Sequence, residues 1–573
     1  MTVAAATTPS PDLSSTEQRP SERGWNLTVA AMGMVALVLL LYLNQAAWFS
    51  NDEWAFVGPG GHSLLAPNNE HWSAVPAVTY SALYAVFRLR TYTPYLLLVL
   101  LAHLAACYML WRLMRRAGVD IAPAFGLAMV AMFLGAGSNN LDWAWEISYV
   151  LPVALGLGWL LLLDRDRLGR AAWLGGPVLG CLVVASSGVG LAVLFAVALA
   201  ALLRHGWRTC VVQVGVPTAV FVAWYLSNRT SVARDAFQVA DLPALGQFVM
   251  SGYIYSFADS LDFGQPAIAF VGGMLAFLGV ALWALYAYRT GWREKAIPVA
   301  MFVSVGVLFL LAGLARVHEH GPEYANQQRY IYNATLVALP LVGLALTALG
   351  RRHGVGRVLV PLVVGFSLAV NAVQLQADLL ASGGDRELVK NSLAAALRLD
   401  PGAALPGVRI EPRHDLVLTL PMARALAADG AFGPLPEPST DTQLRVRANL
   451  GVAMTYETVP ASDGAPVIAI LPADRGVVRA VGEGGCVEAP FRGVDTRVRV
   501  RFRAADGRFS VLGSGDAPIT LALLSDAGDS LQGRAEVPLR NRPGTWTVIH
   551  EALPDQVAEI LFAGTADGTI CGV

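Results

Sequence analysis

Long apolar runs recur along the first 376 residues and limit the possible folds more than any other feature of the sequence. A membrane-spanning helix needs about 20 mostly apolar residues. Eleven runs approach that length, at residues 27–48, 93–111, 121–137, 147–163, 171–186, 188–203, 209–227, 266–288, 296–315, 332–349 and 357–376. Of the 573 residues, 55% are hydrophobic and 14% are charged, which is too apolar for a soluble protein. The sequence therefore predicts an α-helical polytopic membrane domain of about 11 spans over residues 27–376.

The chain begins with a polar, proline-containing segment, residues 1–26, which is typical of a disordered tail. This segment is too long and too polar for the start of a cleaved signal peptide, so the first span is expected to stay in the mature protein. The formal net charge is −1, so the chain lacks the basic field that attracts nucleic acid, and no nucleic-acid partner is expected.

Arginine clusters predict which ends of the spans face the cell interior. If residues 74–88 form an interfacial helix and not a span, every short arginine-rich connection falls on the side of the N-terminus: 112–116, 165–170, 204–208, 289–295 and 351–357. This count predicts a multi-pass protein of the plasma membrane with a cytoplasmic N-terminus. The external face then holds residues 49–92, 138–146, 228–265 and 316–330, and everything after residue 376.

Asp52 and Glu53 stand side by side where the first span ends, in "SNDEWAF". One interpretation is a solvated helix end with tryptophans at the membrane surface. The alternative is chemical, because a carboxylate held near its target and partly withdrawn from water becomes a better general base. Both interpretations stay open at this point.

Two further groups of polar and aromatic residues lie in the predicted external loops. Glu70, His71 and Trp72 precede the interfacial helix, and Asp142, Trp145 and Glu146 lie in the short loop 138–146. A tryptophan face can pack on the C–H face of a sugar while carboxylates bind its hydroxyls, so all six are candidates for substrate binding. Structural histidines and membrane-belt tryptophans are the competing explanation.

The last loop between spans contributes Arg316, Arg329 and Tyr330. Arg329 enters a span, where arginine is costly unless it pairs with an anion, and its planar fork suits phosphate. Anchoring to lipid headgroups or to a loop carboxylate is the alternative. The loop also contains His318 and His320, but nothing nearby completes a recognisable ligand set, so no metal or other cofactor is indicated.

These motifs together resemble those of the GT-C membrane glycosyltransferases, the superfamily of the protein O-mannosyltransferases and the lipid A aminoarabinose transferases. "NDEWAF" is similar to the Asp-Glu-x-x-aromatic signature of the first external loop, and "EHWSAVPAVTY", "YMLWRLMRR" and "RYIYNATLVALPL" resemble later segments. Many relatives have Lys-Pro-Pro where this chain has Ser73-Ala74-Val75-Pro76. The alanine-, arginine- and glycine-rich, lysine-poor composition is typical of a high-GC genome, so an actinobacterial cell envelope is the expected setting.

The resemblance implies transfer of a sugar from a polyprenyl-phosphate donor to a glycan or glycolipid acceptor at the outer face of the membrane. It implies that Asp52 is the catalytic base, with Glu53 as an adjacent participant, and that Arg329 and Tyr330 hold the donor phosphate. The displacement at the anomeric carbon would invert its configuration. Two other classes stay open: a non-catalytic scaffold or lipid-linked glycan transporter, and a glycan polymerase or ligase.

The pattern changes after residue 376. Residues 377–477 predict an external α/β linker that begins with an amphipathic helix at 385–398, and residues 478–573 alternate as short strands, which indicates a jelly-roll-like β-sandwich. Cys486 and Cys571 lie near the two ends of this segment. A pair of cysteines in a region otherwise without them suggests a disulfide, which requires an oxidising compartment.

Overall fold

The computed structural model describes the helical part of the chain almost throughout and the C-terminal part chiefly through its strands. The described residues are 22–57, 62–68, 70–229, 237–258, 266–291, 294–352, 354–399, 409–411, 414–415, 417–440, 442–443, 446, 452–457, 470–471, 486–489, 496–501, 506–514, 519–524, 531–537, 544–551, 557–562 and 567–572. Of the predicted disordered tail over residues 1–26, residues 1–21 lie outside them, and residues 22–26 are instead helical, as the start of α1.

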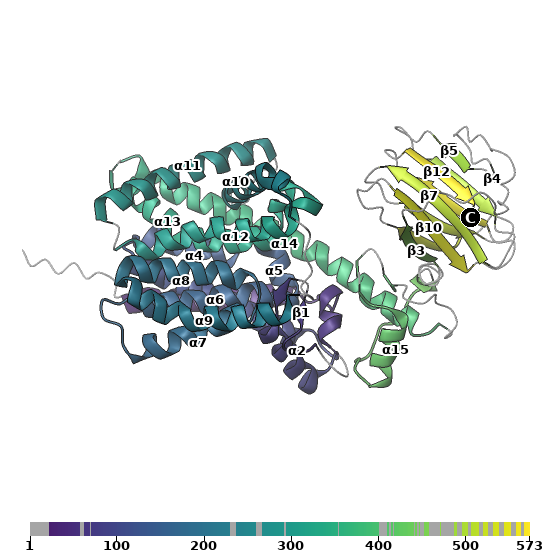
Figure 1. The fold of residues 1–573 in the computed structure, drawn as a ribbon, viewed down its shortest axis with the longest axis horizontal. Helices are drawn as coiled ribbons and strands as arrows, with labels where there is room; N and C mark the ends of the chain where they lie inside the picture. The colour runs from purple at the N-terminus through teal and green to yellow at the C-terminus, as the bar shows by residue number, and fades with distance from the viewer. Residues whose placement is uncertain are drawn as a thin grey trace, which may run out of the picture.

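Fifteen α-helices form the described part of the chain up to residue 428 (Figure 1). They are α1 (Glu22–Leu43), α2 (Ala74–Phe87), α3 (Thr93–Arg116), α4 (Ile121–Met132), α5 (Ser138–Asp142), α6 (Ile147–Leu163), α7 (Arg170–Val184), α8 (Val189–His205), α9 (Trp207–Asn228), α10 (Leu242–Ala258), α11 (Pro266–Gly291), α12 (Ala296–His320), α13 (Gln328–Arg352), α14 (Gly356–Ala396) and α15 (Leu420–Ala428). Short 3-10 helices include η1 (Asn51–Phe56), η2 (Gly135–Gly137), η3 (Ala144–Glu146) and η6 (Pro322–Asn326).

Every predicted span coincides with one of these helices, and the polytopic helical domain is confirmed. By length and apolar composition, 7 of the helices can cross a membrane, or 8 if the bent pair α4 and residues 135–142 is one span. The predicted spans at α7, α8 and α11 are shorter apolar helices in the described residues. The predicted interfacial segment is the short apolar helix α2.

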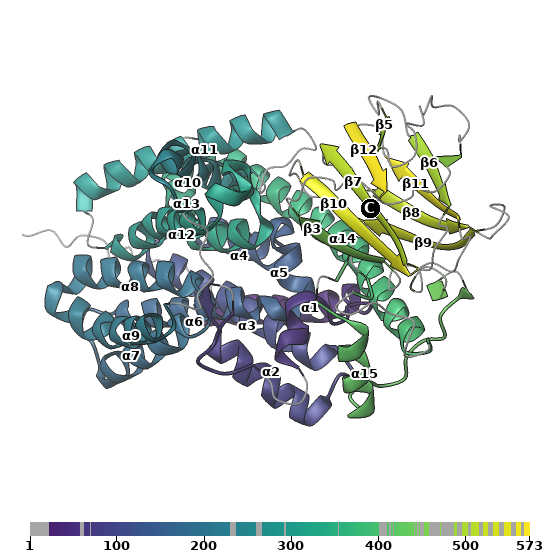
Figure 2. The ribbon, with the colours of Figure 1, turned by 45° about the vertical axis from the view of Figure 1, so that its right-hand side comes forward.

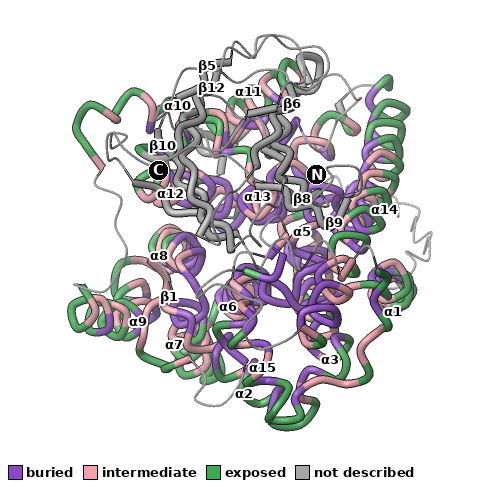
Figure 3. Tube along the Cα trace, turned by 90° about the vertical axis from the view of Figure 1, so that its right-hand side faces the viewer, coloured by how far each residue is buried: buried purple, intermediate pink, exposed green. Residues whose placement is uncertain are grey.

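The buried residues gather where α3, α5 and α6 meet, while α1, α9 and α14 carry long exposed stretches (Figure 3). Exposed leucines and valines on these helices suit a surface that faces lipid. At one end of the bundle, Asp164 binds two arginines, Arg204 at 2.7 Å and Arg116 at 3.8 Å. Arg351 binds Asp120 at 2.6 Å at the same end of α3 and α13. The turns that contain Arg116, Arg204 and Arg351 therefore share one end of the bundle, and the loops with Asp52 and Glu70 lie at the other.

One prediction about the loops is wrong. The segment 228–265 contains α10, which packs inside the bundle: Tyr253 donates to the Phe302 carbonyl at 3.0 Å, and Thr335 donates to the Ser256 carbonyl at 2.9 Å. Its 17 residues are too few for a full span, which explains why the apolar pattern was read as a loop. The helix expected at 385–398 is the outer part of α14, which runs unbroken through residue 376.

The outer part of α14 leads to α15, which lies beside α2 (Figure 2). Arg88, just after α2, binds Asp429 at 2.6 Å, and Leu89 bridges to Phe432. The segment that follows the membrane helices is thus attached to the loop side of the bundle.

Beyond residue 450 the described residues form strands in two antiparallel five-stranded sheets. The strands are β3 (Val452–Glu457), β4 (Ile470–Leu471), β5 (Cys486–Ala489), β6 (Thr496–Arg501), β7 (Asp506–Ser514), β8 (Ile519–Leu524), β9 (Leu531–Val537), β10 (Gly544–Glu551), β11 (Val557–Phe562) and β12 (Asp567–Gly572). The strand orders in the two sheets are β3-β10-β7-β12-β5 and β4-β6-β11-β8-β9. Cys486 and Cys571 are register partners of β5 and β12. The sandwich and the disulfide stay predictions.

Candidate functional site

The first predicted site residues lie on a tight turn after α1. Ser50 precedes η1 and Asn51 opens it in a left-handed backbone conformation, with φ 51°. Such a conformation is uncommon outside glycine and persists where the surrounding structure fixes it. Glu53 supplies one such restraint, since its Oε2 accepts a 2.8 Å hydrogen bond from the Ser50 backbone N–H.

Glu53 and Asp52 lie in different environments. Glu53 has no exposed surface, and its Oε1 accepts hydrogen bonds from Tyr80 and Tyr92. Asp52 is half-buried. Burial raises the pKa of Asp52 above its ordinary value, while the positive charge of Arg329 acts in the opposite direction. Of the two neighbours, Asp52 is therefore the one with a carboxylate free to act on a second molecule.

The loop between α5 and α6 packs directly on this turn. The ring of Trp145 lies 4.1 Å from that of Phe56, and Trp145 is only 4% exposed. Its aromatic face is therefore used in packing η3 onto η1. Next to it, the fully buried Glu146 accepts a 2.9 Å hydrogen bond from the Asn140 side chain and interacts electrostatically with Arg329 and Asp52.

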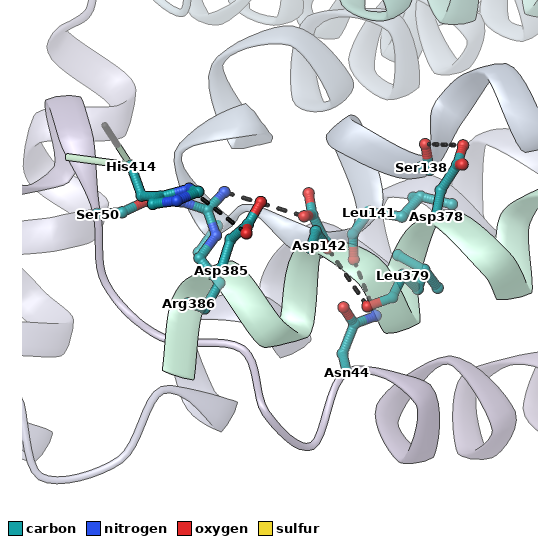
Figure 4. Close-up of polar contacts among 12 residues, drawn as sticks. Asn44, Ser50, Ser138, Leu141, Asp142, Asp378, Leu379, Asp385, Arg386 and His414 are labelled. Carbon is teal, nitrogen blue, oxygen red and sulfur yellow. Dashed lines mark hydrogen bonds and ion pairs between the residues drawn. The ribbon is translucent and has the colours of Figure 1, made fainter. Parts of the chain in front are cut away.

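Asp142 reaches a partner that the sequence analysis missed. Its Oδ2 lies 3.9 Å from a guanidinium nitrogen of Arg386, on the outer part of α14 (Figure 4). On the same helix Asp378 accepts a 2.9 Å hydrogen bond from Ser138, and Ser382 donates to Asp142. The spacing 378, 382, 386 places these residues on one helix face. That periodicity is the signal in the sequence, but the helix predicted at 385–398 does not include Asp378 and Ser382.

A second group of site residues comprises Glu70, His71, Arg316 and Tyr330. Glu70 forms an ion pair with Arg316 and lies 3.4 Å from His71 Nε2. The Tyr330 side chain is hydrogen-bonded to Arg316, and the His71 ring nitrogen lies 3.4 Å from the Tyr149 hydroxyl. Burial lowers the pKa of His71 below its ordinary value, so this imidazole is neutral near pH 7.

Tyr149 joins the two groups. The Arg329 guanidinium lies 5.9 Å from the centre of the Tyr149 ring, close enough for a cation–π contact. His71 also experiences the charges of Arg316 and Arg329. Tyr149 was not among the predicted site residues, because nothing in the local sequence distinguishes it from a core tyrosine.

One predicted site residue lies apart from both groups. Trp72 stacks on Trp224, with ring centres 5.5 Å apart and planes 9° apart, and donates a 2.9 Å hydrogen bond to the Leu64 carbonyl. These contacts attach the loop before α2 to the end of α9.

The first group of site residues comprises Asp52, Asn140, Asp142, Glu146 and Arg329. Several of its buried polar atoms have no hydrogen-bond partner among the described residues. They are Arg329 Nε, Glu146 Oε1, Asp142 Oδ1 and Asn140 Oδ1. A buried polar atom without a partner costs about 1–3 kcal/mol, and such atoms concentrate where a protein binds other molecules. A guanidinium donor and carboxylate acceptors of this kind could bind a phosphate and sugar hydroxyls together.

The described residues contain no group of three histidine, cysteine, aspartate or glutamate side chains arranged to hold a metal ion. His318 instead lies 3.1 Å from Asp241, and the ring of His320 stacks on Tyr324 at 4.3 Å.

No protein-family model matches the chain, and no curated protein matches its sequence. Among solved structures, the chain is similar to ArnT from Cupriavidus metallidurans bound to undecaprenyl phosphate, with a TM-score of 0.41 and 15% identity over 75% of this chain and 92% of that one. It is also similar to the Archaeoglobus fulgidus oligosaccharyltransferase tethered to an acceptor peptide, with a TM-score of 0.40 and 12% identity over 95% and 97% of the two chains.

Proposed function

We propose that this protein transfers a sugar from a polyprenyl-phosphate donor to a hydroxyl of a glycan or glycolipid acceptor. The observation that supports this most directly is the electrostatic interaction of Asp52 with Arg329. A half-buried carboxylate with a raised pKa interacts electrostatically with a guanidinium whose Nε has no partner among the described residues. A base and an anion-binding group are thereby held in one site.

The reaction is a displacement at the anomeric carbon. The acceptor O–H bond breaks and its proton passes to Asp52, while the acceptor oxygen forms a bond to the anomeric carbon. The bond from that carbon to the phosphate oxygen breaks, and its electron pair leaves with the lipid phosphate. Arg329 stabilises the charge that develops there, and Tyr330, held by Arg316, lies beside it.

An apolar cavity supports a lipid-linked donor. It has a volume of about 570 Å³ and is lined by α4, α10, α11, α13 and α14. Thr335, Ala338, Val342, Leu346 and Leu349 line it along one face of α13, the helix whose first turn contains Arg329. A polyprenyl chain whose phosphate binds at the start of α13 could follow this face into the bundle.

The test is Asp52→Asn in the full-length protein, assayed with a panel of polyprenyl-phosphate sugars for consumption of any donor. Loss of a general base lowers the rate by about 100- to 10,000-fold, while binding of undecaprenyl phosphate should remain. Asp166→Asn is the matched control, because Asp166 is fully exposed at the opposite end of the bundle. Full activity of Asp52→Asn would refute the assignment of the base.

The same assay separates the competing class. A wild-type protein that binds a polyprenyl-phosphate sugar and never consumes it would favour a scaffold or a lipid-linked glycan transporter. Consumption with growth of a chain on the acceptor would favour a polymerase.

A further inference from the structure

Asp415 is a fully buried carboxylate in the segment that follows α14. Its Oδ1 accepts hydrogen bonds from the backbone N–H groups of Val417, at 2.9 Å, and Leu418, at 3.0 Å. These bonds fix the carboxylate within its own loop. Because Asp415 is far in sequence from the membrane helices, its remaining bonds show what the loop is held against.

Those remaining bonds go to the turn that carries Asp52. The indole N–H of Trp54 donates to Asp415 Oδ2, and the backbone of Asn51 donates to the same carboxylate. Asp52 lies between these two donors in the sequence. Hydrogen bonds to an ionised acceptor are about twice as strong as neutral ones, so this carboxylate is an effective anchor.

The turn needs an anchor on this side. Asn51 has φ 51°, a conformation that its surroundings must hold. Glu53 restrains the turn through Tyr80 and Tyr92, which belong to the helical domain, and these contacts do not involve the segment after α14. Asp415 supplies the opposing restraint.

We propose that Asp415 is a positioning residue for Asp52, so that the segment after α14 is a working part of the active site. The proposal rests on the proposed function for the role of Asp52, while the contact itself can be tested without turnover. Displacement of a catalytic group by about 1 Å can lower the rate about 100-fold.

A second attachment of the same segment provides a matched control. Asp429 binds Arg88 at 2.6 Å and Tyr84 at 3.0 Å, next to the end of α2 and away from η1. Substituting Asp429 by asparagine weakens the attachment of the segment to the bundle. The bonds from Asp415 to Asn51 and Trp54 remain.

The first measurement is hydrogen exchange of the peptide covering residues 50–57 in the full-length protein, without donor or acceptor. In Asp415→Asn an NH₂ group replaces one carboxylate oxygen, and this group cannot accept hydrogen bonds from Asn51 or Trp54. The backbone amides of residues 50–57 should therefore exchange at least about 10-fold faster. Asp429→Asn should leave this exchange unchanged. Equal exchange in wild type and Asp415→Asn, or equal acceleration in both variants, would overturn the proposal.

The second measurement is the donor kinetics. Asp415→Asn should lower kcat about 100-fold with the donor KM within about threefold, because Arg329 and Tyr330 still hold the phosphate. A role confined to folding would lower the yield of protein and leave kcat unchanged. If Asp52→Asn were fully active, the proposed base would be wrong, and the exchange experiment would still decide whether Asp415 holds the turn.

Trp54→Phe keeps the ring and removes one donor, so the test does not depend on the folding of Asp415→Asn alone. We expect a loss of kcat of about 10-fold in the single variant and little further loss when both substitutions are combined, because both remove the same contact. Additive losses would place the two residues in separate roles and overturn the proposal.

Discussion

The hydroxyl of Tyr80 donates a 2.6 Å hydrogen bond to Glu53 Oε1, the same oxygen that receives a 3.0 Å hydrogen bond from Tyr92. The other oxygen of Glu53 accepts the Ser50 backbone N–H. With three donors and no exposed surface, Glu53 has little capacity to bind a substrate. It fixes the turn from which its neighbour Asp52 acts.

The burial of Glu53 predicts a pH-dependent stability. Burial raises the pKa of Glu53 to about 7 from 4.5, so folding favours its protonated form. Its contribution is fully present below pH 4.5 and is lost as the pH rises through about 7. The melting temperature of wild type minus that of Glu53→Gln should therefore fall between pH 5 and pH 8. Glu437→Gln, at an exposed site, should show a constant difference, and a constant difference for Glu53→Gln would contradict the prediction.

The charge of Arg329 predicts how the activity responds to pH. Burial raises the pKa of Asp52 and Arg329 opposes that rise, so loss of the positive charge should raise the pKa further. In Arg329→Gln the acidic limb of the kcat/KM profile should move to higher pH, while Arg329→Lys should keep it in place. Identical profiles in the two variants would show that Arg329 does not act on the base.

Arg329→Lys should still impair binding of the donor. Lysine keeps the charge but lacks the planar fork, so it loses one of two hydrogen bonds to a phosphate. A hydrogen bond to a charged group contributes about 1.5–3 kcal/mol, which corresponds to a loss of roughly 10- to 100-fold in kcat/KM for the donor. The test measures kcat/KM for a polyprenyl-phosphate sugar and, separately, the inhibition constant of free undecaprenyl phosphate, in wild type and in both Arg329 variants. Equal affinity of both variants and wild type for the free lipid phosphate would place the phosphate elsewhere.

The sequence allowed prediction of the features that local patterns encode. Apolar length marked the spans, and the charge of the turns placed the arginines at one end. The family resemblance implied that Asp52 and Arg329 act in one site, and the two side chains interact electrostatically in the structure. Arg386 and Asp415 could not be predicted in this way, because their partners lie on distant segments. α14 also continues through Gly383 and Gly384, where the local helix propensity is lower by about 1 kcal/mol per glycine, since tertiary packing outweighs such a propensity.

Gly188 provides a test of the second group. A Cβ at this position would lie 2.8 Å from His71 Nδ1, so Gly188→Ala should displace the imidazole from Tyr149. Overpacking of this kind costs about 1–3 kcal/mol of stability. Gly215→Ala, where nothing lies within 4 Å, is the control. The measurement is the melting temperature. Gly188→Ala should lower it in the wild-type protein but not in a His71→Ala background. A decrease that persists in the His71→Ala background would mean that the His71 ring does not clash with the added Cβ.

The pairing of β5 with β12 makes the predicted disulfide testable. Cys486 and Cys571 are directly opposite in antiparallel strands. Opposed Cα atoms in such strands lie about 4.5–5.5 Å apart, within the range of about 4.4–6.8 Å that a disulfide spans. Mass spectrometry of an unreduced digest should therefore recover the two cysteine peptides linked, while Cys181 and Cys210 react with an alkylating agent as free thiols. Because a stable disulfide requires an oxidising compartment, the link would also support an extracytoplasmic C-terminal region. Alkylation of Cys486 and Cys571 in protein purified without reductant would contradict both predictions.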